Sequence, residues 1–202
     1  MTFSQWMLAT LMFFAGSLSG CFNIRYWFGN GPATNGVPNF SEVEPTKVFR
    51  GGQPNSRGWE YLRTLGVKTV VKLDYSDEGV DDEARKLGMT VIDAEMQSKG
   101  FIHWSGSPKA NIVNLAKAEA ALSYESRWPI YVHCLYGEDR TGLVVGEFRV
   151  LHDHWRTSDA YAEMRALGFH LEIHDLHEVW EQFVREHSVR PFTMENRSGA
   201  TD

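Results

Sequence analysis

Short runs of β-branched residues alternate with helical segments along most of the chain. The predicted strands span residues 46–52, 67–74, 89–96 and 128–134. The predicted helices span residues 54–66, 81–88, 107–124, 140–154, 159–168 and 173–186. Because a helix between two strands carries the chain back to the same end of a sheet, such strands run parallel. We therefore predict an α/β fold, a single domain whose mostly parallel central sheet is flanked by helices.

Residues that begin and end helices support these assignments. Asn55 or Ser56 is predicted to cap the first helix, and Gly66 to end it. Ser107, followed by a proline, is predicted to cap the helix that runs to about residue 124. Ser158 is the predicted cap of the helix that follows it.

The composition fits one acidic globular domain. The chain has 202 residues, of which 43% are hydrophobic, enough for one sizeable core. Its formal net charge of −6 argues against binding to nucleic acid, since nucleic-acid-binding proteins usually carry a basic face.

The first 21 residues have a different character from the rest. An apolar stretch too short for a comfortable membrane span ends in Leu18-Ser19-Gly20-Cys21. This end resembles the lipobox of bacterial lipoproteins, which implies cleavage before Cys21 and attachment of lipid to its sulfur. The implied location is the bacterial cell envelope, at the periplasmic side of the outer membrane in a Gram-negative cell. The alternative is an uncleaved anchor helix or a core helix.

Cys134 is the second of only two cysteines. If Cys21 carries lipid, Cys134 has no partner for a disulfide within the chain, so it is either an inert buried residue or a reactive one. It ends the apolar strand of residues 128–134 and precedes a helix. Ligands of parallel α/β sheets bind at this end of the strands.

The residues after Cys134 suit the binding of an oxyanion. The first amides of the following helix lack internal partners and lie at the positive end of the helix dipole, which favours a thiolate and an anion. Gly137 gives the loop backbone freedom, and the planar guanidinium of Arg140 can hold two phosphate oxygens. Thr141 can donate its hydroxyl to the thiolate, and His133 can fix the strand end by side-chain hydrogen bonds.

The segment "HCLYGEDRTG", residues 133–142, matches His-Cys-x5-Arg-Thr-Gly. It resembles the signature of the cysteine-based protein tyrosine phosphatase superfamily. Residues 39–74 and 158–170 also resemble the atypical dual-specificity phosphatases of bacteria, plants and fungi.

The resemblance assigns roles to the residues of this loop. It implies that Cys134 is the nucleophile and that Arg140 binds and stabilises the phosphoryl group. The remaining predicted substrate-binding residues are His133, Leu135, Tyr136, Gly137, Glu138 and Thr141. The implied mechanism uses no cofactor and no metal.

The proton donor for the leaving group is the uncertain part of this prediction. No aspartate lies between Asp93 and Cys134, where such phosphatases usually carry one. Asp139, directly before Arg140, resembles the arrangement in myotubularin-like lipid phosphatases. We favour Asp139 and keep Asp93 as the second choice; either residue can instead serve a structural role.

Glu138 and Asp139 also bear on the substrate. Two carboxylates beside the loop disfavour polyanions, so phosphotyrosine, and with it phosphoserine or phosphothreonine, is the preferred substrate class. The alternatives are a phosphoinositide or inositol-phosphate phosphatase, a pseudophosphatase that binds phosphorylated ligands, and a rhodanese-like sulfurtransferase. His170 and His174, four residues apart, have a spacing that metal sites use, but we favour a solvated helix face.

The predicted organisation has four parts. A signal peptide covers residues 1–20, and a lipid-anchored tether rich in Gly, Pro and Asn covers residues 21–45. The phosphatase domain covers residues 46–190, and a flexible tail covers residues 191–202. The predicted partners are a phosphorylated protein or small phosphomonoester and, through the lipid, a membrane.

Overall fold

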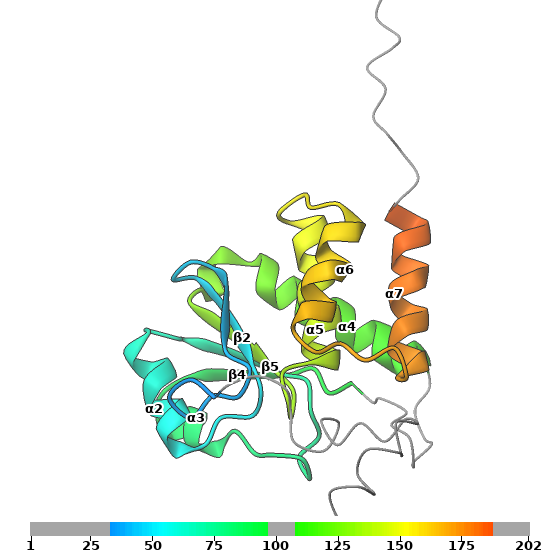
Figure 1. Cartoon of the computed structure of the whole chain (residues 1–202). Coiled ribbons are helices and arrows are strands. Elements are labelled where there is room, and N and C mark those ends of the chain that lie inside the picture. The colour runs from blue at the N-terminus through cyan, green and yellow to red at the C-terminus, as the bar shows by residue number, and fades with distance from the viewer. Residues whose placement is uncertain (1–32, 97–107, 188–202) are drawn as a thin grey trace, which may run out of the picture.

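The computed structural model describes residues 33–96 and 108–187. The strands are β1 (Ser41–Glu44), β2 (Val48–Gly51), β3 (Thr69–Lys72), β4 (Thr90–Asp93) and β5 (Ile130–His133). The helices are α2 (Ser56–Thr64), α3 (Asp82–Lys86), α4 (Pro108–Ser123), the short 3-10 helix η2 (Glu125–Arg127), α5 (Asp139–Leu151), α6 (Thr157–Ala166) and α7 (His174–His187). Figure 1 shows their arrangement.

The sheet has the order β1-β2-β5-β3-β4, so β5 lies at its centre. Strand β5 pairs in parallel with both β2 and β3, and β4 pairs in parallel with β3. Only β1, a strand absent from our prediction, pairs antiparallel, with β2. The predicted α/β class with a mostly parallel sheet is therefore confirmed.

Helices cover both faces of the sheet, with α2 and α3 on one side and α4 to α7 on the other (Figure 1). Successive side chains of a strand point to opposite faces. In β5, Ile130 and Val132 pack into the larger core beneath α4 to α7, whereas Tyr131 packs into the smaller core beneath α2 and α3. All residues of β5 are buried, which explains why this strand reads as a continuous apolar run.

Most predicted helix ends are confirmed. The side chain of Asn55 caps α2 by accepting a hydrogen bond from the amide of Gly58 at 3.0 Å. Gly66 adopts a φ of 78°, the left-handed conformation that ends a helix without strain. The predicted cap at Ser158 is wrong, because α6 begins at Thr157 with Arg156 as its N-cap. Ser107 lies outside the described residues.

The tether predicted for residues 21–45 is wrong for its second part. Val37 is completely buried in the smaller core, and β1 adds a strand to the sheet edge, so residues 37–44 belong to the folded domain. The predicted signal peptide, the lipidation site Cys21 and the tail of residues 191–202 lie outside the described residues. In the part of the chain that is described, no helix combines the length and the apolar character that crossing a membrane requires.

Candidate active site

The loop between β5 and α5 carries the predicted nucleophile. Cys134 follows the buried strand directly and is 3% exposed, and α5 begins at Asp139. Gly137 adopts a φ of 73°, and a Cβ placed on it would lie 2.2 Å from the carbonyl carbon of Gly51. Only glycine fits both the conformation and the space, so the loop closely contacts the end of β2.

Carbonyl groups of this loop are held from outside by neighbouring segments. The carbonyl of Leu135 accepts a hydrogen bond from the amide of Gln53 at 3.0 Å. The carbonyl of Gly137 accepts two, from Arg50 Nη2 at 2.7 Å and from Asn39 Nδ2 at 3.0 Å.

These contacts orient the amides of the loop. The only cis peptide bond among the described residues is Trp128–Pro129, so the peptide bonds of the loop are trans. In a trans peptide the N–H points opposite to the C=O. The amides of Tyr136 and Glu138 therefore point away from the groups that bind the carbonyls. Amides turned to the same side of a loop, next to a helix N-terminus, form the kind of nest that binds anions.

Arg140 lies in the first turn of α5, where Glu78 holds its guanidinium. Its Nη1 donates to Oε2 of Glu78 at 2.6 Å, and its Nη2 donates to Oε1 at 2.8 Å. Burial, the largest single effect, works against the charged form, but the hydrogen bonds to Glu78 and the negative charges of Cys134, Glu78 and Asp74 together hold the pKa of Arg140 above the ordinary arginine value. Burial would raise the pKa of Glu78, but the hydrogen bonds and the charge of Arg140, together with the Tyr75 amide and Lys72, lower it. The guanidinium is thus a fixed cation beside the loop.

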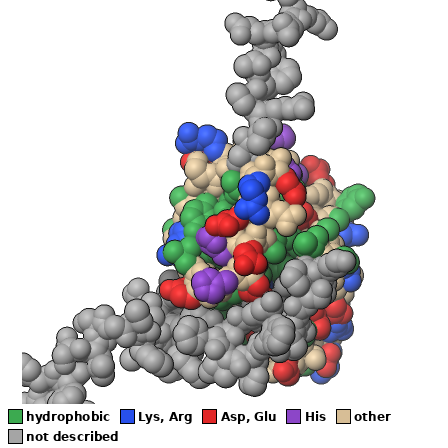
Figure 2. Space-filling model, turned by 90° about the vertical axis from the view of Figure 1, so that its right-hand side faces the viewer, with side chains coloured by type: hydrophobic (Ala, Val, Ile, Leu, Met, Phe, Trp, Pro, Cys, Tyr) green, Lys and Arg blue, Asp and Glu red, His purple; other side chains and the backbone are tan. Residues whose placement is uncertain are grey.

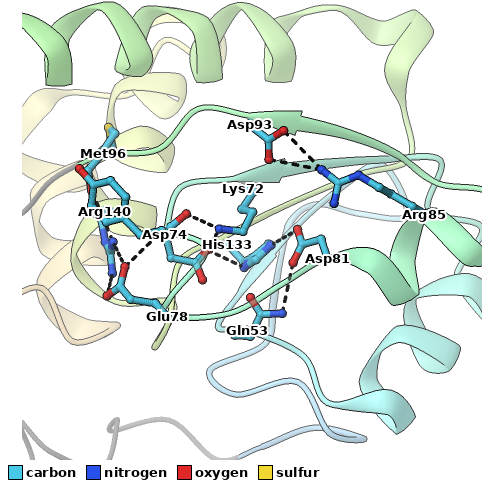
Figure 3. A network of polar contacts seen from close by, with 11 residues as sticks. Gln53, Lys72, Asp74, Glu78, Asp81, Arg85, Asp93, Met96, His133 and Arg140 are labelled. Carbon is cyan, nitrogen blue, oxygen red and sulfur yellow. Dashed lines mark hydrogen bonds and ion pairs between the residues drawn. The ribbon is translucent and has the colours of Figure 1, made fainter.

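A buried polar cluster surrounds His133, the residue before the nucleophile (Figure 3). Its Nε2 lies 3.0 Å from Oδ2 of Asp81, and its Nδ1 lies 3.4 Å from Oδ1 of Asp74. Lys72 donates from Nζ to the backbone carbonyl of Asp74. Burial raises the pKa of Asp74. The His133 ring therefore fixes the strand end between two carboxylates, while a contribution to substrate binding stays a prediction.

Thr141 is completely buried one residue after Arg140. Its hydroxyl oxygen has no hydrogen-bond partner within the described part of the chain. A buried hydroxyl without a partner is uncommon in folded proteins, and it leaves this group able to donate to a thiolate or an anion.

Asp139 contacts the segment between α6 and α7. Its Oδ1 accepts hydrogen bonds from the backbone amide of His170 at 2.7 Å and from His170 Nδ1 at 3.1 Å. The bond to Asp139 raises the pKa of His170. Glu138 is buried beside them, against Gly168. Asp139 is thus half of an ion pair at the start of α5.

The histidines near the C-terminus occupy different places. His170 precedes α7 and contacts Asp139, whereas His174 begins α7, so the two do not share a helix face. Three potential metal-ligand atoms lie within 4.8 Å of one another, one each from Glu138, Asp139 and His170. These three groups could hold a cation, although Asp139 already bonds His170. Figure 2 shows the α7 side of the molecule, where acidic and histidine side chains lie close together.

Asp93 lies at the edge of the sheet, two strands away from β5. Its carboxylate is about half exposed and pairs with Arg85 at 3.3 Å. Figure 3 shows it directed toward Arg85 and away from Arg140. The second choice for the proton donor is therefore not brought to the loop.

Four polar residues at this site were missing from the sequence-based prediction: Arg50, Asp74, Glu78 and Asp81. The three acids follow β3: in the prediction Asp74 ended the strand of residues 67–74, Asp81 began the helix of residues 81–88, and Glu78 lay between these two elements. Only their position could have identified them, because they follow the carboxyl end of β3, which lies beside the carboxyl end of β5. The sequence did not indicate that these two strands are neighbours.

A comparison with models of protein families supports the interpretation of this geometry. The model of the tyrosine phosphatase family matches residues 37–198, which include the whole described domain from the buried Val37 to α7. The chain therefore belongs to the tyrosine phosphatase family.

Individual relatives agree with this assignment. The dual specificity protein phosphatase TpbA of Pseudomonas aeruginosa is 28% identical over 131 residues, a match that covers 65% of this chain and 55% of TpbA. This chain thus spans little more than half of that relative's length.

Two solved structures share the fold. TpbA in complex with pTyr matches with a TM-score of 0.56 and 19% identity over 79% of this chain and 96% of that one. The catalytic core of the PP-IP phosphatase SIW14 from S. cerevisiae, in complex with citrate, matches with a TM-score of 0.58 and 20% identity over 79% and 98%. At these identities the likeness supports the fold and no more.

Proposed function

We propose that this protein is a phosphatase that hydrolyses phosphomonoesters through a cysteinyl-phosphate on Cys134. One observation carries the proposal: the loop from Cys134 to Asp139 turns its amides away from its anchored carbonyls, beside a helix N-terminus and the fixed cation Arg140. A nucleophile, a cradle of amides and a guanidinium together match the needs of phosphoryl transfer.

The reaction has two steps. The Cys134 thiolate attacks phosphorus, the S–P bond forms, and the bond to the ester oxygen breaks as that oxygen takes up a proton. Water then attacks phosphorus, the S–P bond breaks, and inorganic phosphate leaves with the thiolate restored. Glu78 uses one N–H of each Nη atom of Arg140. The Nε–H and the second N–H on Nη2 stay available for phosphate oxygens. Thr141 donates its unpartnered hydroxyl to the thiolate.

Asp139 is the proton donor in this proposal. It stands directly before Arg140, and its hydrogen bond to His170 raises the pKa of His170, which favours a proton on the pair. The pair as a whole holds one transferable proton at the rim of the loop.

Phosphotyrosine is the substrate class that we favour. The pTyr complex of the similar TpbA structure supports it. So do the carboxylates of Glu138 and Asp139, which oppose a densely charged ligand. The alternative is an inositol phosphate, the class suggested by the name of the SIW14 phosphatase.

We further propose that a lipid on Cys21 anchors the protein in the bacterial cell envelope. Support comes from the sequence Leu18-Ser19-Gly20-Cys21 after an apolar stretch. Among the described residues Val37 is the first that is buried in the core, and some fifteen residues separate it from Cys21 in the sequence. The domain would then act on substrates outside the cytoplasm.

The test measures phosphate release by the full chain in detergent from four substrates. These are a phosphotyrosine peptide, a phosphoserine peptide, a phosphoinositide and an inositol polyphosphate. Cys134→Ser should abolish turnover, whereas Cys21→Ser, the matched change at the other cysteine, should keep it. Preference for the phosphotyrosine peptide supports the favoured class, and preference for the inositol polyphosphate supports the alternative. If nothing is turned over while vanadate still binds, the protein is a pseudophosphatase.

A further inference from the structure

Arg50 lies in β2, beside the strand that ends in the nucleophile, and is only 1% exposed. Its Nη2 donates to the carbonyl of Gly137 at 2.7 Å. Its Nε and Nη1 have no hydrogen-bond partner in the described part of the chain. A fully buried guanidinium with two unpartnered nitrogens is costly, and buried charges are normally paired.

The other cations near the loop have carboxylate partners. Glu78 holds Arg140 with two hydrogen bonds, and Asp74 lies 3.8 Å from the Lys72 ammonium. Arg50, in contrast, has no carboxylate oxygen within 4.0 Å among residues 33–96 and 108–187, the ranges that the structure describes.

The charges that act on Arg50 point to a different partner. Burial lowers the pKa of Arg50 to about 10, and the negative charges of Glu163 and then Cys134 oppose this change. Glu163 is already engaged, because its Oε1 pairs with Arg149 at 2.9 Å. Of these two negative charges, only that of Cys134 is not already paired with another arginine.

We propose that Arg50 is a positioning residue for the catalytic loop and the counter-ion of the Cys134 thiolate. Its Nη2 holds the Gly137 carbonyl, while its Nε and Nη1 have no partner among the described residues. Arg50 pairs in register with Val132, two residues before Cys134, and Val132 and Cys134 belong to the same core cluster, so the unpaired charge lies on the Cys134 side of the sheet. Arg140 then binds the phosphoryl group, while Arg50 stabilises the Cys134 thiolate. The inference rests on the proposed function only for its effect on turnover.

Other ionisable groups around Cys134 set the background for its titration. Tyr131 and Arg140 interact electrostatically with Cys134. Asp74 and Asp81 flank the neighbouring His133, and their negative charges oppose a thiolate. Because no described carboxylate pairs with Arg50, its charge is the one best able to stabilise the Cys134 thiolate.

The experiment follows alkylation of Cys134 by iodoacetamide as a function of pH in the full chain. Mass spectrometry of the peptide that contains Cys134 separates its reaction from that of Cys21. The variants are Arg50→Met, which removes the charge, Arg50→Lys, which keeps it, and Asn39→Gly. The last change removes the hydrogen bonds that Asn39 donates to the carbonyls of Gly137 and Leu167, keeps the Arg50 charge, and suits the φ of 46° at that position. The control is Arg85→Met, at an exposed arginine of α3 whose partner Asp93 lies in the edge strand β4.

In Arg50→Met the pH midpoint of alkylation should rise by about one unit, the smallest shift typical of losing an adjacent opposite charge. Arg50→Lys should restore most of this shift. Asn39→Gly should lower phosphatase turnover by about fivefold, the effect of the one hydrogen bond that it removes from the loop, with the midpoint unchanged. Arg85→Met should change neither quantity.

An unchanged midpoint in a folded Arg50→Met variant would overturn the proposal. If Arg50→Met gives no cooperative melting transition, Arg50→Lys is the deciding variant. Because it keeps the positive charge, a rise of its alkylation midpoint by a full pH unit would contradict a role for the charge. A matching shift in Asn39→Gly would assign the effect to loop geometry instead. Alkylation requires no turnover, so these results stand even if the protein proves not to be a phosphatase.

Discussion

Gly137 combines two requirements in one residue. Its positive φ turns the loop, and its missing side chain lets the loop touch β2. Gly66, at the end of α2, has a nearly equal φ of 78° but has nothing within 4 Å of the place where a Cβ would stand. A substitution at Gly66 therefore tests backbone strain alone, whereas one at Gly137 tests strain together with the close contact to β2.

We expect Gly137→Ala to lower kcat/KM on a phosphotyrosine peptide by about a hundredfold or more, because the loop must move by an ångström or so to relieve the clash. Gly66→Ala should cost about 1 kcal/mol of unfolding free energy, the strain of a left-handed alanine, and leave kcat/KM within about twofold. Steady-state kinetics and urea denaturation of both variants measure these effects. Equal losses of kcat/KM in the two variants would contradict the contact seen at Gly137.

Asp139 offers a second test at this scale. Asp139→Asn keeps an oxygen for the amide of His170 but cannot donate a carboxyl proton. We expect turnover of a phosphoserine peptide, a poor leaving group, to fall about a hundredfold or more, in the range that general acids contribute. Turnover of p-nitrophenyl phosphate, whose leaving group needs no proton, should fall by less than about threefold. A similar loss on both substrates would show that Asp139 serves only the loop structure.

The residues of the loop were readable from the sequence because they are contiguous. Cys134, Gly137 and Arg140 fall in one segment whose spacing is local. Arg50 and Glu78 contact that segment from 87 and 62 positions away, respectively, in sequence. No periodicity or cap marks such a contact, because it depends on which strands are neighbours in the sheet.

At the scale of elements, helix α5 carries the site and is the most deeply packed helix. Residues Arg140 to Arg149 are all buried between the sheet and α4, α6 and α7. Among them is Glu147, whose pKa is raised first by burial and then by Glu119 of α4. The direction means that the folded protein keeps a proton on Glu147 that the unfolded chain releases above its ordinary pKa of 4.5. Stability must therefore fall as the pH rises above that value.

Glu147→Gln should remove this pH dependence, since a glutamine amide can donate to Glu119 without a proton to lose. We expect the variant to be about 1 kcal/mol or more stable than the wild type at pH 8, and nearly equal to it at pH 4. Urea unfolding at both pH values measures the difference. The nearby charges Glu186 and His187 are unchanged in both proteins. Glu60→Gln, at an exposed ion pair, should change the unfolding free energy by less than about 0.5 kcal/mol at either pH.

The helices were predicted better than the strands at this scale. Caps such as Asn55 and stops such as Gly66 act within one turn, so they can be read locally. Strand β1 escaped prediction because it is a short edge strand of mixed polarity within a segment that resembled a tether. Its pairing with β2 and the burial of Val37 nearby are tertiary effects.

For the whole molecule, the central proposal is a folded domain connected to a lipid at Cys21. The contacts that hold the loop and Arg140 come from Asn39, Arg50 and Glu78, all within the described domain. Catalysis and anchoring should therefore separate cleanly. Attachment should change where the protein resides and leave the chemistry of the loop unchanged.

Cys21→Ser tests this separation in a Gram-negative host. We expect the wild-type chain to incorporate labelled palmitate and to sediment with membranes, because acyl chains contribute about 0.8 kcal/mol per buried CH₂. The variant should incorporate no label and should leave the membrane fraction. Its kcat/KM on a soluble phosphotyrosine peptide should stay within about twofold of the wild-type value in detergent, since the cradle residues are unchanged. Ser19→Ala, a change within the same segment that spares the cysteine, should still be labelled. Label on Cys21→Ser would show that the lipid is attached to another residue, and membrane association without label in the wild type would favour an uncleaved apolar helix as the anchor.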